Sequence, residues 1–184
     1  YLYGSDNILV RDFNIVDFAT DGITVSGDNA ASGPCTNVRI EGCDCYNNRR
    51  NGLSIIHAKG VEVVGGRYRS SNGAPSGPWA GIDVEPNANN VCQDIVIEGV
   101  RTDSNVGGGL LFVPGNQSLA LGTTFTVTVN GGTSDSDGST AGVPALRFAN
   151  GGAFTNQVYG RVVVRDFAII NPLSRGVSFA NWDA

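Results

Sequence analysis

Several residue types are scarce or absent in this chain. Among its 184 residues it has no methionine, one lysine (Lys59) and one histidine (His57), and only 16% of the residues are charged. A chain without methionine lacks an initiator residue, so we expect it to be a processed or excised segment. Its net charge is −5 and it has no basic run, whereas phosphate binding needs clustered Lys and Arg. We therefore expect no nucleic-acid partner.

Long apolar runs and helical periodicity are also missing. No stretch approaches the 18 or so consecutive apolar residues of a transmembrane helix, and the first residues do not resemble a signal peptide. We therefore expect no membrane partner. Apolar residues at 3.6-residue spacing are absent, while Gly, Asn and β-branched residues are abundant, which disfavours helices. Because 41% of the residues are hydrophobic, the chain must nevertheless bury a core.

The sequence contains a repeat of short alternating strands. One strand begins at residues 8, 38, 61, 95, 127 and 162, so successive copies are 30, 23, 34, 32 and 35 residues apart. A second strand follows Gly or Ala and reads Gly22-Ile-Thr-Val, Gly52-Leu-Ser-Ile, Gly81-Ile-Asp-Val, Gly109-Leu-Leu-Phe, Ala145-Leu-Arg-Phe and Gly176-Val-Ser-Phe. A third short strand lies between them and is clearest at residues 13–15, 43–45 and 167–169.

This repeat predicts an all-β fold, a parallel β-helix (solenoid) of about six turns with three short strands each. Equivalent residues would stack about 4.8 Å apart. Gly42, Gly65, Gly99 and Gly131 stand where the first strand bends into the third, a bend that glycine tolerates. A β-sandwich would instead need antiparallel hairpins, but the Asn-Gly pairs occur at strand bends. We expect residues 1–184 to form a single domain that is a piece of a longer solenoid.

Two stretches carry a family resemblance. The segments Asn37-Val-Arg-Ile-Glu-Gly-Cys43 and Asn47-Asn-Arg-Arg-Asn-Gly-Leu-Ser-Ile55 resemble the pectin-lyase-like superfamily of right-handed parallel β-helices. The overlapping stretch from Asn47 through Gly81-Ile-Asp-Val-Glu-Pro-Asn87 is similar to a form that recurs in bacterial right-handed β-helix proteins, and the resemblance covers essentially the whole chain. It implies a right-handed parallel β-helix with a carbohydrate-related function, because the superfamily includes polysaccharide lyases, polyuronate epimerases, glycoside hydrolases and phage tailspikes.

Strand alternation predicts which side chains point outward. In the strand after each Gly or Ala, the outward positions are Thr24, Ser54, Asp83, Leu111, Arg147 and Ser178. Asp83 and Glu85 form the one outward carboxylate pair, and two residues of spacing put their Cβ atoms roughly 7 Å apart. This spacing is compatible with a glycosidase pair, and the same two carboxylates could instead hold a Ca²⁺ ion. The plainer alternative is a solvated strand residue followed by a turn residue.

Three basic residues flank the carboxylates and complete the set of catalytic candidates. Arg49 and Arg50 precede the strand one turn earlier, and His57 follows it. Polyuronate chemistry needs a cation that neutralises the substrate carboxylate and a base that removes the C5 proton, and Asp83 and Glu85 could supply the base. The alternatives are solvated turn arginines and a structural histidine.

Four more residues are candidates for substrate binding. Trp79 could stack on a sugar face or anchor a loop. Asp21 and Asp103 are expected in comparable turns before a strand, and Arg147 shares the outward column of Asp83.

Motifs of particular branches match only in part. The alginate-epimerase pattern Tyr-Gly-Phe-Asp-Pro-His resembles residues 80–85, where Asp83 matches the Asp but Ala80 replaces the Tyr and Glu85 the His. The Asn-Thr-Asp, Asp-Asp and Gly-His-Gly motifs of polygalacturonases are absent.

The four cysteines are predicted to be free thiols. Cys43 and Cys45 alternate inward on one strand, where two side chains cannot bridge. Cys35 and Cys92 are expected in loops two turns apart, roughly 9.6 Å by stacking, which exceeds the reach of a disulfide.

Two hypotheses about function follow. The first is a carbohydrate-active protein that acts on acidic polysaccharide by lyase, epimerase or hydrolase chemistry in a groove on the β-helix. The second is a non-catalytic β-helix that binds glycans or serves as a structural module, like a tailspike or adhesin. Both predict a polysaccharide partner and an extracellular or cell-surface location, and both leave the substrate and the oligomeric state open.

Overall fold

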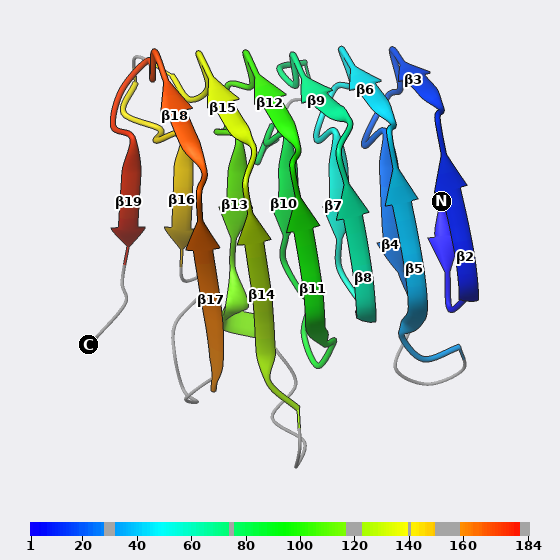
Figure 1. The fold of residues 1–184 in the computed structure, drawn as a ribbon. Coiled ribbons are helices and arrows are strands. Elements are labelled where there is room, and N and C mark those ends of the chain that lie inside the picture. The colour runs from blue at the N-terminus through cyan, green and yellow to red at the C-terminus, as the bar shows by residue number, and fades with distance from the viewer. Residues whose placement is uncertain (28–31, 74–75, 117–122, 140, 150–158, 181–184) are drawn as a thin grey trace.

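The chain folds into a parallel β-solenoid with three strands in each turn (Figure 1). The computed structural model describes residues 1–27, 32–73, 76–116, 123–139, 141–149 and 159–180. Within these ranges the only helical segment is the 3₁₀ turn η1 (Pro114–Asn116), and no helix is long and apolar enough to cross a membrane. The predicted fold class is confirmed.

Three sheets run along the solenoid, and the chain passes from sheet B to sheet C to sheet A in each turn. Sheet A has seven strands: β1 (Leu2–Tyr3), β4 (Ile23–Ser26), β7 (Leu53–Ile55), β10 (Ile82–Val84), β13 (Leu110–Phe112), β16 (Leu146–Ala149) and β19 (Val177–Ala180). Sheet B has six: β2 (Asp6–Arg11), β5 (Cys35–Glu41), β8 (Ala58–Val64), β11 (Cys92–Glu98), β14 (Phe125–Asn130) and β17 (Gly160–Arg165). Sheet C has six: β3 (Asn14–Val16), β6 (Asp44–Tyr46), β9 (Arg67–Arg69), β12 (Arg101–Asp103), β15 (Thr133–Asp135) and β18 (Ala168–Ile170).

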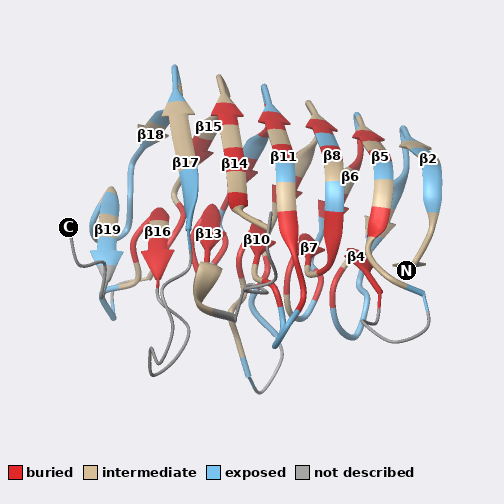
Figure 2. Cartoon of the chain, turned by 90° about the horizontal axis from the view of Figure 1, so that it is seen from below, coloured by how far each residue is buried: buried red, intermediate tan, exposed pale blue. Residues whose placement is uncertain are grey.

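The core lies between the three sheets and is built from columns of inward side chains. Ile82 of β10 pairs with Leu53 and Leu110 in the neighbouring turns, and all three are fully buried. Because side chains alternate along a strand, one apolar residue in every two is enough to fill this interior. Figure 2 shows that the buried residues gather in the central turns and that β2 and β19 at the two ends are more exposed.

The corner between sheets B and C is a column of residues in the left-handed region. Its members are Asp12, Gly42, Gly65, Gly99, Gly131 and Asp166, with φ between 53° and 66°. Except at Asp166 in the last turn, each corner amide bonds to the next turn, as the Gly99 N–H does to the Asn130 carbonyl at 2.9 Å. The sharp bend predicted at these glycines is confirmed.

The sheet C strands begin one residue later than predicted, at Asn14 and Asp44 rather than at residues 13 and 43. The preceding residue still belongs to the bend, because it directly follows the left-handed corner residue. This shift leaves Cys43 and Cys45 pointing into the core as expected.

The predicted loop position of Cys35 and Cys92 is wrong. Both begin a sheet B strand, and both align with Ala58 of the intervening turn, because β5 and β11 extend to meet β8 along its whole length. All four cysteines are buried and free, which confirms the predicted thiols.

Candidate functional site

The predicted outward column of sheet A is present. Strand pairing aligns Thr24, Ser54, Asp83, Leu111, Arg147 and Ser178 in successive turns. In the middle of the column these outward side chains are not exposed to solvent: Ser54 is fully buried and Asp83 is only 2% exposed. Asp83 therefore lies beneath the surface of the sheet A face.

Asp83 and Glu85 form a carboxyl pair at the end of β10. The Asp83 carboxyl accepts a hydrogen bond from Asn51 Nδ2 to its Oδ2 atom at 3.2 Å. Glu85 follows the strand and is partly exposed, and its charge acts on Asp83. The two carboxyl groups therefore interact, although they belong to residues two positions apart.

Burial and mutual repulsion both change the acidity of this pair. Burial raises the pKa of Asp83 well above its ordinary range, and the charge of Glu85 raises it further, against the opposing effects of Arg50 and Asn51. Burial also raises the pKa of Glu85, and the charges of Arg50 and Arg147 oppose that rise. Carboxyl groups with raised pKa values are suited to proton transfer near neutral pH.

Arg50 and Asp21 form an ion pair beside the carboxyl pair. Arg50 Nε lies 3.2 Å from Asp21 Oδ1, and the Asp21 side chain is almost completely buried. Asp21 Oδ1 also accepts the Asn51 N–H at 3.1 Å. Two of the predicted residues, Arg50 and Asp21, therefore lie at the site.

Arg147 lies on the opposite side of the pair from Arg50. It belongs to β16, whereas Arg50 precedes β7, and β10 lies between these strands in sheet A. Its positive charge acts on Glu85. Among the described residues Arg147 has no ion-pair partner within 4 Å. It is thus a cation available to a ligand.

Asn51 is a residue of this site that the sequence analysis missed. It is fully buried, and its Nδ2 donates to Ser54 Oγ at 2.9 Å as well as to Asp83. Its Oδ1 accepts the Ala80 N–H at 2.9 Å. Asn51 precedes Gly52 just as Asp21 precedes Gly22. Alignment with the candidate residue Asp21 could therefore have identified Asn51 from the sequence.

His57 and Arg49 are held by contacts with the backbone. The ring of His57 is 3% exposed, and its Nδ1 accepts the Val91 N–H at 2.9 Å. Arg49 donates from Nε and Nη2 to the Gly73 carbonyl at 3.2 and 3.1 Å. These contacts give both residues a structural role, and a catalytic role for them stays a prediction.

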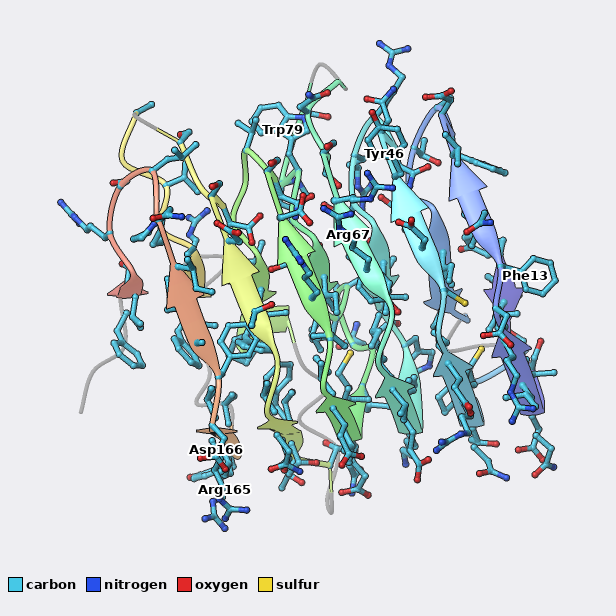
Figure 3. All side chains as sticks on the ribbon, turned by 45° about the horizontal axis from the view of Figure 1, so that its top comes forward. Phe13, Tyr46, Arg67, Trp79, Arg165 and Asp166 are labelled. Atoms are coloured by element: carbon cyan, nitrogen blue, oxygen red, sulfur yellow. The ribbon has the colours of Figure 1, made fainter. Side chains whose placement is uncertain are left out.

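Trp79 lies at the corner between sheets C and A (Figure 3). Its carbonyl accepts the Gly107 N–H at 2.9 Å, and its φ of 58° places it in the left-handed region. It precedes β10, whereas Glu85 follows that strand, so the two residues lie at opposite ends of β10. Stacking of a sugar on Trp79 stays a prediction.

The predicted turn position of Asp103 is wrong. Asp103 is the last residue of β12 in sheet C, where it lies 2.6 Å from Arg67 Nε and 3.6 Å from Arg101 Nε. Figure 3 labels Arg67, which begins β9 of the same sheet C. The sequence analysis did not locate the third strand of this turn at Arg101-Thr-Asp103, because its inward residue is a threonine rather than an apolar residue. Asp103 therefore belongs to sheet C, whereas Asp83 lies in sheet A and Asp21 precedes a sheet A strand.

The described residues contain no group of three or more His, Cys, Asp or Glu side chains placed to hold a metal ion. Asp83 and Glu85 supply two carboxyl groups, whereas Ca²⁺ takes six to eight oxygen ligands. Binding of Ca²⁺ by this pair stays a prediction.

Comparisons of the chain with protein-family models, with curated proteins and with solved structures found no match. The chemistry of the site must therefore be inferred from its own residues.

Proposed function

We propose that this solenoid is a carbohydrate-active protein that acts on acidic polysaccharide at the Asp83–Glu85 pair. The observation that carries the proposal is a carboxyl pair, with Asp83 buried and Glu85 partly exposed, that is flanked by Arg50 on one side and Arg147 on the other. The three parallel sheets, together with the segments of sequence that resemble this superfamily, favour a right-handed β-helix of the pectin-lyase-like superfamily.

The direct interaction of the two carboxyl groups favours proton abstraction over hydrolysis. Glycosidase pairs stand about 5 to 9.5 Å apart, because the sugar, and in inverting enzymes a water molecule, must lie between them. Asp83 and Glu85 instead interact directly, so they resemble one tuned base more than two opposed groups. A single base suffices to remove the C5 proton of a uronic acid.

In this mechanism Glu85, the more exposed carboxyl, takes the C5 proton of the substrate. Arg147, together with Arg50, neutralises the substrate carboxylate and thereby stabilises the negative charge that develops next to it. In elimination, the electron pair from C5 forms the C4–C5 double bond, and the O4 leaving group departs and takes a proton from water. In epimerisation, C5 instead regains a proton from water on its opposite face.

Turnover of uronate polymers by the purified chain tests this function. Elimination is followed by the ultraviolet absorbance of the unsaturated uronic acid, and epimerisation by deuterium incorporation at C5 in D₂O. Glu85→Gln is expected to lower the rate roughly 100-fold or more, because a positioned general base contributes at least that factor.

The control for this test is Glu98→Gln, which changes an exposed carboxylate of sheet B. It should leave the rate unchanged. Absence of turnover on every uronate polymer, with and without Ca²⁺, would refute the enzymatic function, and an active Glu85→Gln variant would refute the site.

A non-catalytic glycan-binding module is the second candidate. The burial of Asp83 favours it, because a buried carboxyl group is not accessible to a substrate. This alternative predicts binding of acidic oligosaccharides in calorimetry without turnover. Arg147→Gln should then weaken binding, because Arg147 carries the available cation. Undiminished binding by Arg147→Gln would locate the glycan elsewhere on the molecule.

A further inference from the structure

One oxygen atom of the buried Asp83 carboxyl is left without a donor. Asp83 Oδ2 accepts the Asn51 amide, but no described residue donates to Oδ1. An ionised carboxylate can only accept hydrogen bonds, so an ionised Asp83 would bury a charged oxygen with no donor. Such burial is strongly unfavourable, and protonation removes the problem.

The charges around Asp83 are already balanced without it. Arg50 pairs with Asp21, and Arg147 acts on Glu85, so an ionised Asp83 would add a negative charge with no cation of its own. Burial also raises the pKa of the Cys92 thiol, which keeps that group neutral. The titratable and charged groups that face Asp83 are thus Glu85, Arg50, Asp21 and Cys92, with Arg147 beyond Glu85.

We propose that Asp83 and Glu85 share one proton at neutral pH, carried by Asp83 Oδ1 and donated to the Glu85 carboxylate. This arrangement turns the oxygen without a donor into a donor itself, and Glu85 is the charged group with the largest effect on Asp83. Glu85 is then the charged member of the pair and Asp83 the neutral one.

Asn51 decides which Asp83 oxygen carries the proton. Its Oδ1 accepts the Ala80 N–H, so its Nδ2 must be the atom that faces Asp83. Because Nδ2 can only donate, Asp83 Oδ2 must accept, and the proton is left to Oδ1. Asn51 is therefore a positioning residue for the pair.

The proton assignment gives the two carboxyl groups different roles. Glu85 is ionised and partly exposed, so it is the member able to take a proton from a ligand, while Asp83 stabilises its charge by donating a hydrogen bond. As a statement about catalysis this assignment rests on the proposed function, whereas the proton itself can be measured with no substrate present.

Infrared spectroscopy of the purified chain at pH 7 tests the proposal. A protonated carboxyl group gives a carbonyl band that is separate from the amide and carboxylate bands and that shifts in D₂O. We expect one such band in the wild-type chain to be lost in Asp83→Asn. Glu85→Gln should retain this band at a shifted frequency, because an amide oxygen replaces the carboxylate as acceptor.

Asp137→Asn is the matched control, because Asp137 is a fully buried carboxyl that hydrogen-bonds to Thr102, Ser134 and Asn105. Its substitution should leave the Asp83 band in place. Equal acid-carbonyl absorption in the wild type and Asp83→Asn would overturn the proposal.

A second measurement on the wild-type chain keeps the test decisive if Asp83→Asn does not fold. Carboxyl ¹³C chemical shifts at pH 7 should report Asp83 as protonated and Glu85 as ionised. Two ionised groups, or the reverse assignment, would refute the shared proton. Because neither measurement uses a substrate, an inactive chain that shows the band refutes the proposed function alone.

Discussion

At the corner where sheet C leads into sheet A, buried asparagine side chains hydrogen-bond to the backbone of the preceding turn. Asn48 accepts the Phe18 N–H at 3.1 Å, and Asn105 accepts the Ser71 N–H at 3.0 Å. Each asparagine also donates to a sheet C carbonyl of that preceding turn. Ser71 occupies the equivalent position in the turn between them, and its buried hydroxyl has no partner among the described residues. The ladder is therefore interrupted at one step.

Ser71→Asn should complete this ladder and stabilise the chain. The new amide can bond to the preceding turn, for a gain in the free energy of unfolding of about 0.5–1.5 kcal/mol. Gly52 corresponds to Gly81 beside Asn105, where an added Cβ would lie 2.9 Å from the amide nitrogen, and at Gly52 the new amide must pack beside Tyr68. Urea denaturation measures the change.

The reciprocal variant Asn105→Ser provides the control for this prediction. It should lower the free energy of unfolding, because it removes the same two bonds from a neighbouring turn. A Ser71→Asn chain no more stable than the wild type would show that the position cannot accept an amide.

Among the elements, the short strands of sheet A are held by their packing more than by their length. Phe112, Phe148 and Phe179 lie in one column of β13, β16 and β19, with ring centroids 5.4 and 4.5 Å apart. Phe112 is fully buried, whereas Phe179 is 65% exposed at the last turn. The same residue type therefore occupies two very different environments in one column.

Phe112→Ala should destabilise the chain by about 3–5 kcal/mol, because it leaves a cavity in the closed core. Phe179→Ala should cost much less, since most of its ring remains in water in the folded state. Chemical denaturation of the two variants compares them under identical conditions. Similar losses for both would contradict the view that burial within the column sets the stability.

The whole molecule is a stack in which each turn contacts mainly its neighbours. Inward residues of the central turns, such as Val63 and Ile97, are fully buried, whereas Val10 and Val164 in the end turns are only partly buried. Stability in such stacks is approximately a sum of terms for each turn and for each contact between turns. Resistance to opening should therefore fall from the middle towards both ends.

Hydrogen exchange should reveal this gradient. Amides of β8 and β11 are expected to exchange more slowly than those of β2 and β17 by roughly tenfold or more, which corresponds to about 1.4 kcal/mol in the free energy of opening. Exchange followed by mass spectrometry of peptides resolves the four strands. Uniform protection along the chain would mean that the solenoid opens as a single unit.

Local patterns predicted most of the fold. Alternation in Gly81-Ile-Asp-Val correctly predicted that Ile82 points inward and Asp83 outward, because successive side chains of a strand point to opposite faces of the sheet. Gly99 correctly marked a corner, since φ values near 60° favour glycine. No comparable signal marked Asp103, because its strand has threonine as its inward residue.

The repeat in the sequence by itself determined the architecture, because the three-strand period and the period-2 alternation leave a stacked coil as the way to bury so many short apolar segments. It also identified Asp83, Glu85, Arg50, Asp21 and Arg147 as candidates. Only the tertiary structure decided that these five lie together, that Asp103 lies apart, and that Asp83 is covered. Contacts between turns depend on strand register and on how far each side chain reaches across the spacing of about 4.8 Å between neighbouring strands. Neither can be read from a single stretch of sequence.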